Sequence, residues 1–581
     1  EITTRLVGSE MCIRDRYIAS SGLRNSQNAL NTTANNLANV DTEGYVRQQV
    51  LFSDKEYNTF GTAAVSKQQA GLGLDIGDVV HARDYFLDKA YRAESGRQAF
   101  YESCFTAVDE IQTYFQEMEG KTFQSALEDF KKAFQELAKD PSDSVRQNLV
   151  VQKAGLFLSR SQSVYEGLKS YQSNINTKVS QDIDKINKLG HKIHELNQQI
   201  SKIEAGGIET AMDLRDERDL ALDQLGALAK ISYKEDYKGV VTVKLEDEYF
   251  VDELHTYEIG KKTDKLTGFI TPYWPQLSDT DRDIYVNVFD FNVDISTALN
   301  SDVGELKALI MSRGDHWADY SDIEGKGEQE YLDTTNLSVI IDMQAKLDQM
   351  VHNMITAIND QLCPNVTGPV GVTYQDANGN TVNLSDAKVL DTENCARGSD
   401  GELPPRELFV RAGIERYTEV TGSDGKTYYV YNEEDTSDTS YMYSLTSCGV
   451  NEDLKKIETL FPHLKQNGEV DQQLGERLEA LWNKDLVGLD PTDPDECNIE
   501  EYYQKMIGGL ATVGNVYQKK AENLAGSVLT IENNRQQVIG VSSDEELQNM
   551  IKFQNAYNAS SRFMTVISDM IEHIVTRLGN G

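Results

Sequence analysis

A heptad repeat near the carboxyl end of the chain restricts its fold more than any other feature. Two rows of mostly apolar residues recur there every seven positions, the second row three residues after the first. The first row is Met550, Tyr557, Met564, Ile571 and Leu578, and the second is Phe553, Ser560, Ile567 and Ile574. An ordinary core helix can show this spacing by chance, but four heptads favour a helix over about 543–578 with one narrow apolar seam. Such a helix is not stable alone and needs a partner.

The segment 17–40 is the predicted partner of that helix. It has the same seven-residue spacing, together with small residues that permit a close approach of two helices. The rows are Leu23, Leu30 and Leu37 with Ser26, Thr33 and Val40, and the small residues are Ala19, Ala29, Ala34 and Ala38. We therefore predict that the two ends of the chain form one coiled coil, an inner domain made of 17–52 and 541–581. Ser543 and Glu546 are a predicted capping box at the start of the last helix.

Residues 1–16 do not continue this pattern. They interrupt the heptad, and no initiating methionine stands at position 1. We expect a non-native or disordered leader here and assign it no function.

The middle of the chain alternates between helical and β patterns. Apolar stripes with helical spacing predict a long bundle, and short β-branched or aromatic runs between turn signals predict β-rich inserts. The predicted parts are a bundle domain of 53–230, 300–362 and 498–540, a small β-rich insert at 231–299, an outer β insert at 364–450, and a helical and acidic linker at 451–497. The predicted fold is mainly α with inserted β domains, arranged as an elongated multidomain rod.

The sequence has no recognisable catalytic or metal-binding motif. Its six cysteines are scattered without a Cys-x-x-Cys pair, and His191 and His194 are not spaced as in a His-Glu-x-x-His zinc site. The acidic run 279–283 lacks the glycine and the terminal glutamate of an EF-hand loop. We predict no catalytic residue, no metal, no cofactor and no enzymatic activity. A disulfide among the three cysteines of 363–448 stays an open alternative.

The charge of the chain limits its partners. A formal net charge of −38 repels phosphate, so we expect no binding to nucleic acid or to anionic membrane surfaces. No apolar run is long enough to cross a bilayer, and no cleavable signal peptide is recognisable.

A specific signature follows the first predicted helix. The order Asn-Asn-Leu-Ala-Asn at 35–39 is followed by Thr-Glu-Gly-Tyr-Val-Arg at 42–47. Asn39 competes with helical hydrogen bonds and Gly44 accepts a positive φ, so the segment predicts a helix stop. This order resembles the amino-terminal signature of the flagellar axial proteins, which are the rod, hook and hook-associated proteins.

Further stretches resemble the hook-associated members of that family. They are 83–92 and 534–560, with shorter similarities at 213–219 and 304–309. The resemblance covers about 17–230, 300–360 and 500–578, and it is absent from 364–450.

The resemblance implies a structural subunit of the bacterial flagellum that polymerises between hook and filament. It implies export by the flagellar type III apparatus without a cleaved signal. The implied partners are further copies of the chain, the hook protein, the next hook-associated junction protein, and an export chaperone on the C-terminal helix. Alternatives are another axial protein of the hook or rod, or an axial protein whose outer insert acts as an adhesin or enzyme.

Two groups of residues are predicted to serve this assembly. The assembly seam consists of Leu23, Leu30, Leu37, Val40, Met550, Phe553, Tyr557, Met564, Ile567, Ile571 and Ile574. The signature turn consists of Asn39, Gly44, Tyr45 and Arg47, which we expect to fix the exit of the chain from the inner domain.

Overall fold

The computed structural model of the protein describes residues 2–54, 58–63, 66–70, 73–116, 122–206, 210–376 and 379–577. The chain forms two compact units. The first consists of Glu1–Gln98, Lys185–Glu258 and Asn523–Gly581, and the second of Ala99–Asp184 and Ile259–Glu522. Three long helices contribute residues to both: α2 (Tyr85–Gln116), α4 (Ser144–Glu204) and α11 (Ile499–Ile539). The finer division of the chain into six parts stays a prediction.

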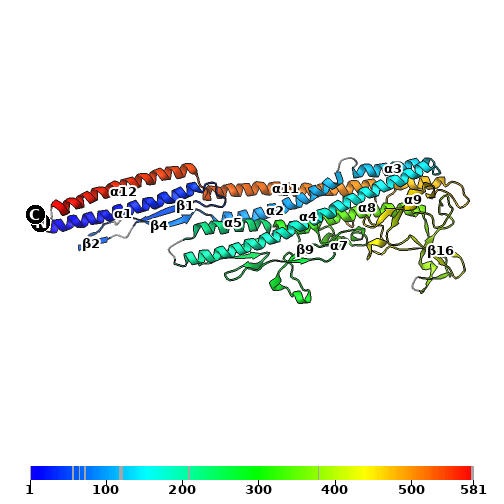
Figure 1. Ribbon diagram of the computed structural model, residues 1–581, viewed down its shortest axis with the longest axis horizontal. Helices are drawn as coiled ribbons and strands as arrows, with labels where there is room; N and C mark the ends of the chain where they lie inside the picture. Colours follow the sequence, from blue (N-terminus) through cyan, green and yellow to red (C-terminus); the bar gives the residue numbers. More distant parts are fainter. Residues whose placement is uncertain are drawn as a thin grey trace. The chain divides into compact units, whose positions relative to one another are not determined.

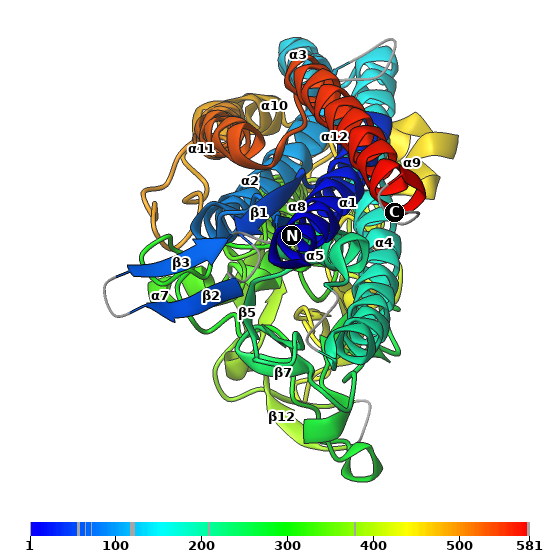
Figure 2. The same cartoon turned by 90° about the vertical axis from the view of Figure 1, so that its left-hand side faces the viewer.

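The first unit contains the two terminal helices, α1 (Ile2–Ala38) and α12 (Ser543–Arg577), which lie side by side in Figure 1 and Figure 2. They are antiparallel, because Gly22 approaches Ser560 whereas Asn36 contacts Glu546. The predicted pairing of the two chain ends is therefore confirmed. Two antiparallel strand pairs follow α1, namely β1 (Gln48–Asp54) with β4 (Leu74–His81), and β2 (Asn58–Ala63) with β3 (Ser66–Ala70).

The helix α1 begins at Ile2 and includes most of the segment 1–16, for which we expected disorder. The segment contains no proline, and Arg, Leu, Met and Glu residues in it favour a helical backbone although the heptad is interrupted. That the segment is non-native stays a prediction.

A small sheet completes the first unit. After α5 (Met212–Leu228), the strands β5 (Ile231–Glu235), β6 (Val241–Leu245) and β7 (Glu248–Val251) form an antiparallel sheet in that order. Side chains of the central strand β6 alternate between buried and half-buried, as expected when one face covers a core. The buried Asn197 of α4 attaches this sheet, because its amide both donates to Val241 O (2.8 Å) and accepts from Val241 N–H (3.0 Å).

The helices of the second unit enclose an aromatic core. They are parts of α2, α4 and α11 with α3 (Phe123–Lys139), α6 (Glu305–Arg313), α7 (Glu328–Asp333), α8 (Val339–Leu362), α9 (Glu452–Lys456) and α10 (Gln472–Ala480). Phe130 stacks on Phe157 with ring centroids 5.6 Å apart and meets Trp482 edge-on at the same distance. In α8, the apolar residues with helical spacing between Ile340 and Ile358 are buried, as expected for a bundle helix.

Short strands make up the inserts of the second unit. They are β8 (Gly260–Thr263) with β9 (Ile270–Tyr273), a four-stranded sheet in the order β10 (Asn365–Thr367), β13 (Lys388–Leu390), β16 (Thr427–Tyr431) and β15 (Tyr417–Thr421), and the pairs β11 (Thr373–Gln375) with β12 (Thr381–Asn383) and β14 (Phe409–Arg411) with β17 (Cys448–Val450). Residues 285–288, within the predicted β-rich insert 231–299, do not form a strand; an isolated bridge joins Asn287 to Tyr273. A mainly α fold with β inserts is confirmed.

Candidate functional site

The predicted rows of α12 form the buried face of that helix. The side chains less exposed than their neighbours recur three or four residues apart, and they are Glu546, Met550, Phe553, Tyr557, Ser560, Met564, Ile567 and Ile571. Ile567 is the most completely buried apolar side chain among them, with 2% exposure. The side chain of Ile574, and all of Leu578, lie outside the described residues. The spacing of α12 alone was therefore enough to locate its packed face.

The packed face of α1 includes Ser26 and Thr33 of the second predicted row, together with the predicted small residues Ala19 and Ala29. Small and polar side chains are buried there, whereas Leu23, Leu30 and Leu37 are only half-buried. The buried residues are Ala19, Asn25, Ser26, Ala29, Thr33 and Asn36. Small residues let the two helix backbones approach, and the leucines are buried to about the same degree as most of the predicted rows of α12. The placement of Val40 on the seam is wrong, because α1 ends at Ala38 and Val40 is 38% exposed.

The helix α1 approaches α12 closely at Gly22. A Cβ atom at this position would lie 2.8 Å from Ser560 Oγ and 3.6 Å from Ser560 Cβ. Ser560, the polar residue in the second row of α12, therefore faces Gly22 of α1. The pair tolerates a serine at this level because there is no large apolar side chain opposite it.

The signature segment turns the chain away from α1. The Asn39 N–H donates to Asn35 O (3.1 Å) at the helix end, and Gly44 adopts a φ of +80°, as predicted. The buried Val46 then follows, and its N–H donates to Asp216 Oδ2 of α5 (3.0 Å). This contact joins the exit of the terminal helix pair to the rest of the first unit.

Asn36 connects four parts of this exit. Its amide donates to Gln48 O (2.9 Å) and accepts from Gln48 N–H (3.1 Å), as a neighbouring strand would. Its Oδ1 also accepts from the Tyr45 hydroxyl (2.9 Å), and its Nδ2 donates to Glu546 Oε2 of α12 (3.3 Å). Burial, with the Asp213, Asp216 and Glu546 carboxylates, raises the pKa of Tyr45 to about 12, so the hydroxyl stays a donor. Asn36 therefore forms hydrogen bonds with both the signature turn and α12.

Arg47 makes the second link to α12. Its Nε donates to Glu546 Oε1 (2.8 Å), its Nη2 donates to Glu545 Oε1 (2.7 Å), and its backbone N–H donates to Ile539 O (2.9 Å). The predicted capping box is wrong, because the Glu546 carboxylate binds Arg47 and Asn36 instead of reaching back to the helix start. The sequence held a signal for this role, since Glu546 occupies the second heptad row seven residues before Phe553. A carboxylate in an apolar row requires a partner.

Next to this exit, six charged side chains form a closed ring of alternating sign, which we call the charge ring. Its members, in order around the ring, are Arg83, Asp88, Arg535, Asp223, Arg92 and Asp219. Adjacent members contact each other at 2.5 to 3.0 Å. They come from the segment leading into α2, from α2 itself, from α5 and from the end of α11. Each carboxylate contacts two guanidinium groups, so the ring holds three helices of the first unit in one arrangement.

Asp216 lies beside the charge ring and is the acidic group that burial perturbs in this region. Burial raises its pKa to about 7, against the lowering effects of the Val46 N–H and Arg83, while the Asp219 and Asp213 carboxylates also raise it. The folded state therefore binds the proton more tightly than the unfolded chain does. The stabilising effect of this proton is present below about pH 4 and is lost as the pH rises toward 7.

We expect Asp216→Asn to stabilise the protein at high pH. An amide keeps the acceptor for Val46 N–H and carries no charge, so the variant should gain on the order of 2–4 kcal/mol in free energy of unfolding at pH 8. At pH 4 the two proteins should differ little. Urea unfolding of both proteins across this pH range tests the expectation, and an equal difference at pH 4 and pH 8 would contradict it.

The candidate catalytic and metal-binding residues of the sequence do not meet. His191 Nε2 lies 2.7 Å from Glu258 Oε1, whereas His194 Nδ1 faces the backbone oxygen of Asp252 at 3.3 Å. Over the described ranges, no group of three His, Cys, Asp or Glu side chains is placed to hold a metal ion. The same residues include no helix that is both long and apolar enough to span a bilayer. All six cysteines are free thiols.

Family comparisons relate this chain to flagellar axial proteins. Residues 108–373 match the family described as "Flagellar hook-associated protein FlgK helical domain". Residues 17–45 match "Flagella basal body rod protein", and 536–577 match "Flagellar basal body rod FlgEFG protein C-terminal". The two shorter matches cover the second half of α1 and all of α12, and the longer one covers the end of α2 and all of α3 to α8.

Full-length relatives agree with these matches. "Flagellar hook-associated protein 1" of Bacillus subtilis (strain 168) is 25% identical over 97% of this chain and 98% of its own length. The protein of the same name from Salmonella typhimurium is 19% identical over 96% of this chain and 98% of its own. The solved structure of "the flagellar hook junction protein FlgK from Burkholderia pseudomallei" aligns with a TM-score of 0.47 and 12% identity over 77% of this chain and 99% of that one.

The family matches at both ends and in the middle, together with relatives aligned over nearly the whole chain, agree on one group of structural flagellar proteins. This chain is therefore similar over nearly its whole length to the proteins named flagellar hook-associated protein 1 (FlgK).

Proposed function

We propose that the chain is a structural subunit of the bacterial flagellum that polymerises at the junction between hook and filament. We further propose that α1 and α12 are the part through which neighbouring copies contact one another. The similarity to these proteins supports the first statement. The second rests on one observation, a row of exposed apolar side chains on α12 beside the face that packs on α1.

That second apolar row consists of Phe563, Val566 and Met570, which we call the outer row. Its members follow each other at three and four residues and therefore lie on one side of the helix. All three are well exposed, Val566 by 48% of its surface. Exposed apolar side chains in register along a helix are typical of surfaces that pack on another helix. In a helical assembly of identical subunits, each outer row meets the terminal helices of the next copy.

Other partners follow from the position in the flagellum. The assembled subunits contact the hook protein on one side and the next hook-associated junction protein on the other. Before assembly, an export chaperone binds the exposed surface of α12 and covers the outer row. The subunit passes through the flagellar type III apparatus without a cleaved signal, and it carries out no catalysis.

Deletion of the gene tests the first statement. The mutant should produce hooks without filaments and release flagellin into the medium, as seen by electron microscopy and by immunoblotting of the supernatant. Filaments of normal length and number on the deletion strain would contradict the proposed place in the flagellum.

Val566→Asp tests the outer row. A carboxylate in an apolar contact that recurs in every subunit should prevent assembly, because burying an unpaired charge is strongly unfavourable. We expect fewer than about one cell in ten to carry a filament, while the circular dichroism of the purified subunit stays unchanged. Asn558→Asp is the matched control, since it adds the same charge at an exposed polar position of α12. Wild-type filament numbers with Val566→Asp would exclude the outer row as the contact.

A further inference from the structure

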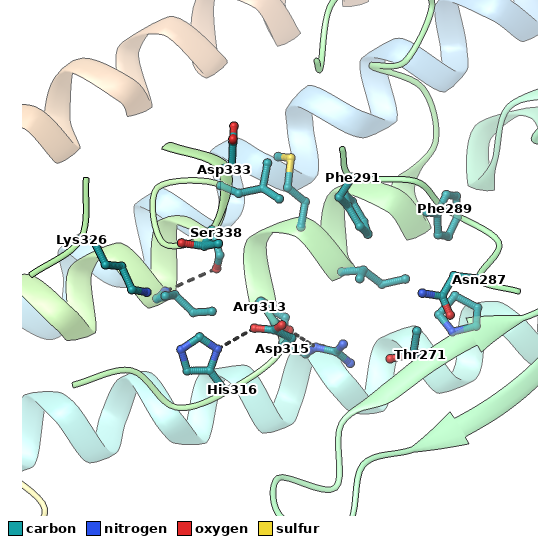
Figure 3. Close-up of a pocket in the computed structure, with 17 residues that line it drawn as sticks. Thr271, Asn287, Phe289, Phe291, Arg313, Asp315, His316, Lys326, Asp333 and Ser338 are labelled. Carbon is teal, nitrogen blue, oxygen red and sulfur yellow. Dashed lines mark hydrogen bonds and ion pairs between the residues drawn. The ribbon is translucent and has the colours of Figure 1, made fainter. Parts of the chain in front are cut away.

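The second unit contains a cavity of about 470 Å³ between β9, the loop 287–291, α6 and the start of α8, shown in Figure 3. One wall is apolar and includes Phe289, Phe291, Ile310 and Leu337. The volume lies within the range of small-molecule sites in proteins.

Arg313, the last residue of α6, lines the cavity and is only 1% exposed. Its guanidinium contacts neutral acceptors, since Nη1 donates to Asn176 Oδ1 (2.6 Å) and Ile270 O (3.0 Å), and Nε donates to Gly314 O (2.9 Å). Among the described residues, no carboxylate lies within 4.0 Å of a guanidinium nitrogen of Arg313. Burial lowers the pKa of this arginine to about 10, although the nearby Asp315 acts in the opposite direction.

The other two cations of the cavity already have carboxylate partners. His316 binds Asp315 at 2.6 Å and Asp322 at 3.1 Å, and Lys326 contacts Asp322 at 3.1 Å. Hydrogen bonds that His316 donates to these two carboxylates raise its pKa to about 10, so the imidazole is charged at neutral pH and its charge is balanced. Arg313 differs from its neighbours in having no carboxylate at ion-pair distance among the described residues; the Phe269 ring, 4.8 Å from Cζ, and the more distant Asp315 offset part of its charge. An anion in the cavity would supply the direct partner.

The position of the Arg313 guanidinium relative to the apolar wall indicates which kind of ligand would fit the cavity. In Figure 3 it is directed toward Thr271 and Asn287, on the same side of the cavity as Phe289 and Phe291. An anion bound there would have its charge at Arg313 and any apolar body against the two rings. A carboxylate matches the planar guanidinium, and an aromatic or aliphatic body matches the wall.

We propose that this cavity binds a small organic monocarboxylate, with the carboxylate at Arg313 and an apolar body of about ten non-hydrogen atoms against Phe289 and Phe291. The site is separate from the proposed assembly surface, because all of its residues belong to the second unit. Its failure would leave the flagellar role untouched.

Titration calorimetry of the full chain with benzoate and hexanoate tests the proposal, with benzamide as the uncharged match of benzoate. We expect saturable binding of the two carboxylates with dissociation constants on the order of 0.1–1 mM, and binding of benzamide at least tenfold weaker. Absence of saturable binding, or equal affinity for benzoate and benzamide, would overturn the proposal. Acetate binding as tight as benzoate would also overturn it, since acetate lacks the apolar body.

Two variants locate the site. Arg313→Gln should weaken benzoate at least tenfold, and Asn287→Trp should do the same by filling the cavity from an exposed position without changing Arg313. Asp333→Asn is the matched control, because it removes an exposed negative charge from the rim and should leave benzoate affinity equal or higher. Unchanged affinity in Asn287→Trp would place the binding elsewhere and overturn the proposal even if Arg313→Gln misfolds.

Discussion

An Ile567→Asp subunit is expected to fold in its second unit but to lose the pairing of its terminal helices, and cells that produce it should have hooks without filaments. Ile567 has 2% exposure on the face of α12 that packs against α1. A carboxylate there cannot be hydrated while the helices stay paired, so the pair should open. Met564→Asp, at a half-buried position of the same face, should act in the same direction with a smaller effect.

Limited proteolysis of the purified subunits separates this expectation from general misfolding. Ile567→Asp should be trimmed from both chain ends at least tenfold faster than the wild type, while a core that contains the second unit resists. Thr565→Asp is the matched control, because it places the same charge at an exposed position two residues away. If Ile567→Asp assembled into filaments, or if its ends resisted protease as well as wild-type ends do, the packed face of α12 would not be needed for assembly.

The two terminal helices show which part of a coiled coil can be read from a sequence. In α12 large side chains fill the seam, so the apolar rows and the buried rows coincide. In α1 the buried row is made of small and polar residues, and their spacing carries no hydrophobic signal. The three leucines of α1 are half-buried, whereas Ser26 and Thr33 of the second predicted row are buried. The seven-residue spacing of such a helix can be predicted from its sequence. Which side of the helix is buried depends on the helix that packs against it.

The signature turn was predictable in its backbone but not in its contacts. A positive φ at Gly44 follows from the residue type, and the structure has it. The binding of Arg47 to Glu545 and Glu546, about 500 positions later in the chain, depends on the pairing of α1 with α12. Asn36 was part of the quoted signature, but its four contacts become visible only when the first strand and α12 are in place.

The charge ring joins three stretches whose resemblance to axial proteins was noted separately. The stretch 83–92 supplies Arg83, Asp88 and Arg92, the stretch 213–219 supplies Asp219, and the stretch 534–560 supplies Arg535. The sixth member, Asp223, follows the stretch 213–219 one helical turn later. Each stretch taken alone resembles an exposed, mixed-charge helix surface. The stretches have in common that they lie side by side in the folded protein. A single sequence does not show which of its segments come together in space. The motifs were therefore recognisable from the sequence, whereas the physical reason for their residues required the fold.

Arg92→Met is expected to destabilise the first unit by about 3 kcal/mol, the largest effect among single changes in the charge ring. Arg92 is the least exposed arginine of the ring, with 3% of its side chain accessible, and it binds Asp219 at 3.0 Å and Asp223 at 2.6 Å. Burial alone would lower the pKa of Arg92, but the two carboxylates raise it above its ordinary value. Methionine keeps most of the apolar stem, so the change isolates the lost charge from lost packing.

Urea unfolding with a probe in the first unit measures this loss, and Lys192→Met is its matched control. Lys192 pairs with Glu217 at 2.8 Å, but about half of each side chain is exposed, so breaking that pair should cost less than about 1 kcal/mol. Added salt should reduce the effect of Lys192→Met further and leave the effect of Arg92→Met nearly unchanged, because buried pairs are poorly screened. Equal and small losses in both variants would mean that the charge ring does not hold α2, α5 and α11 together.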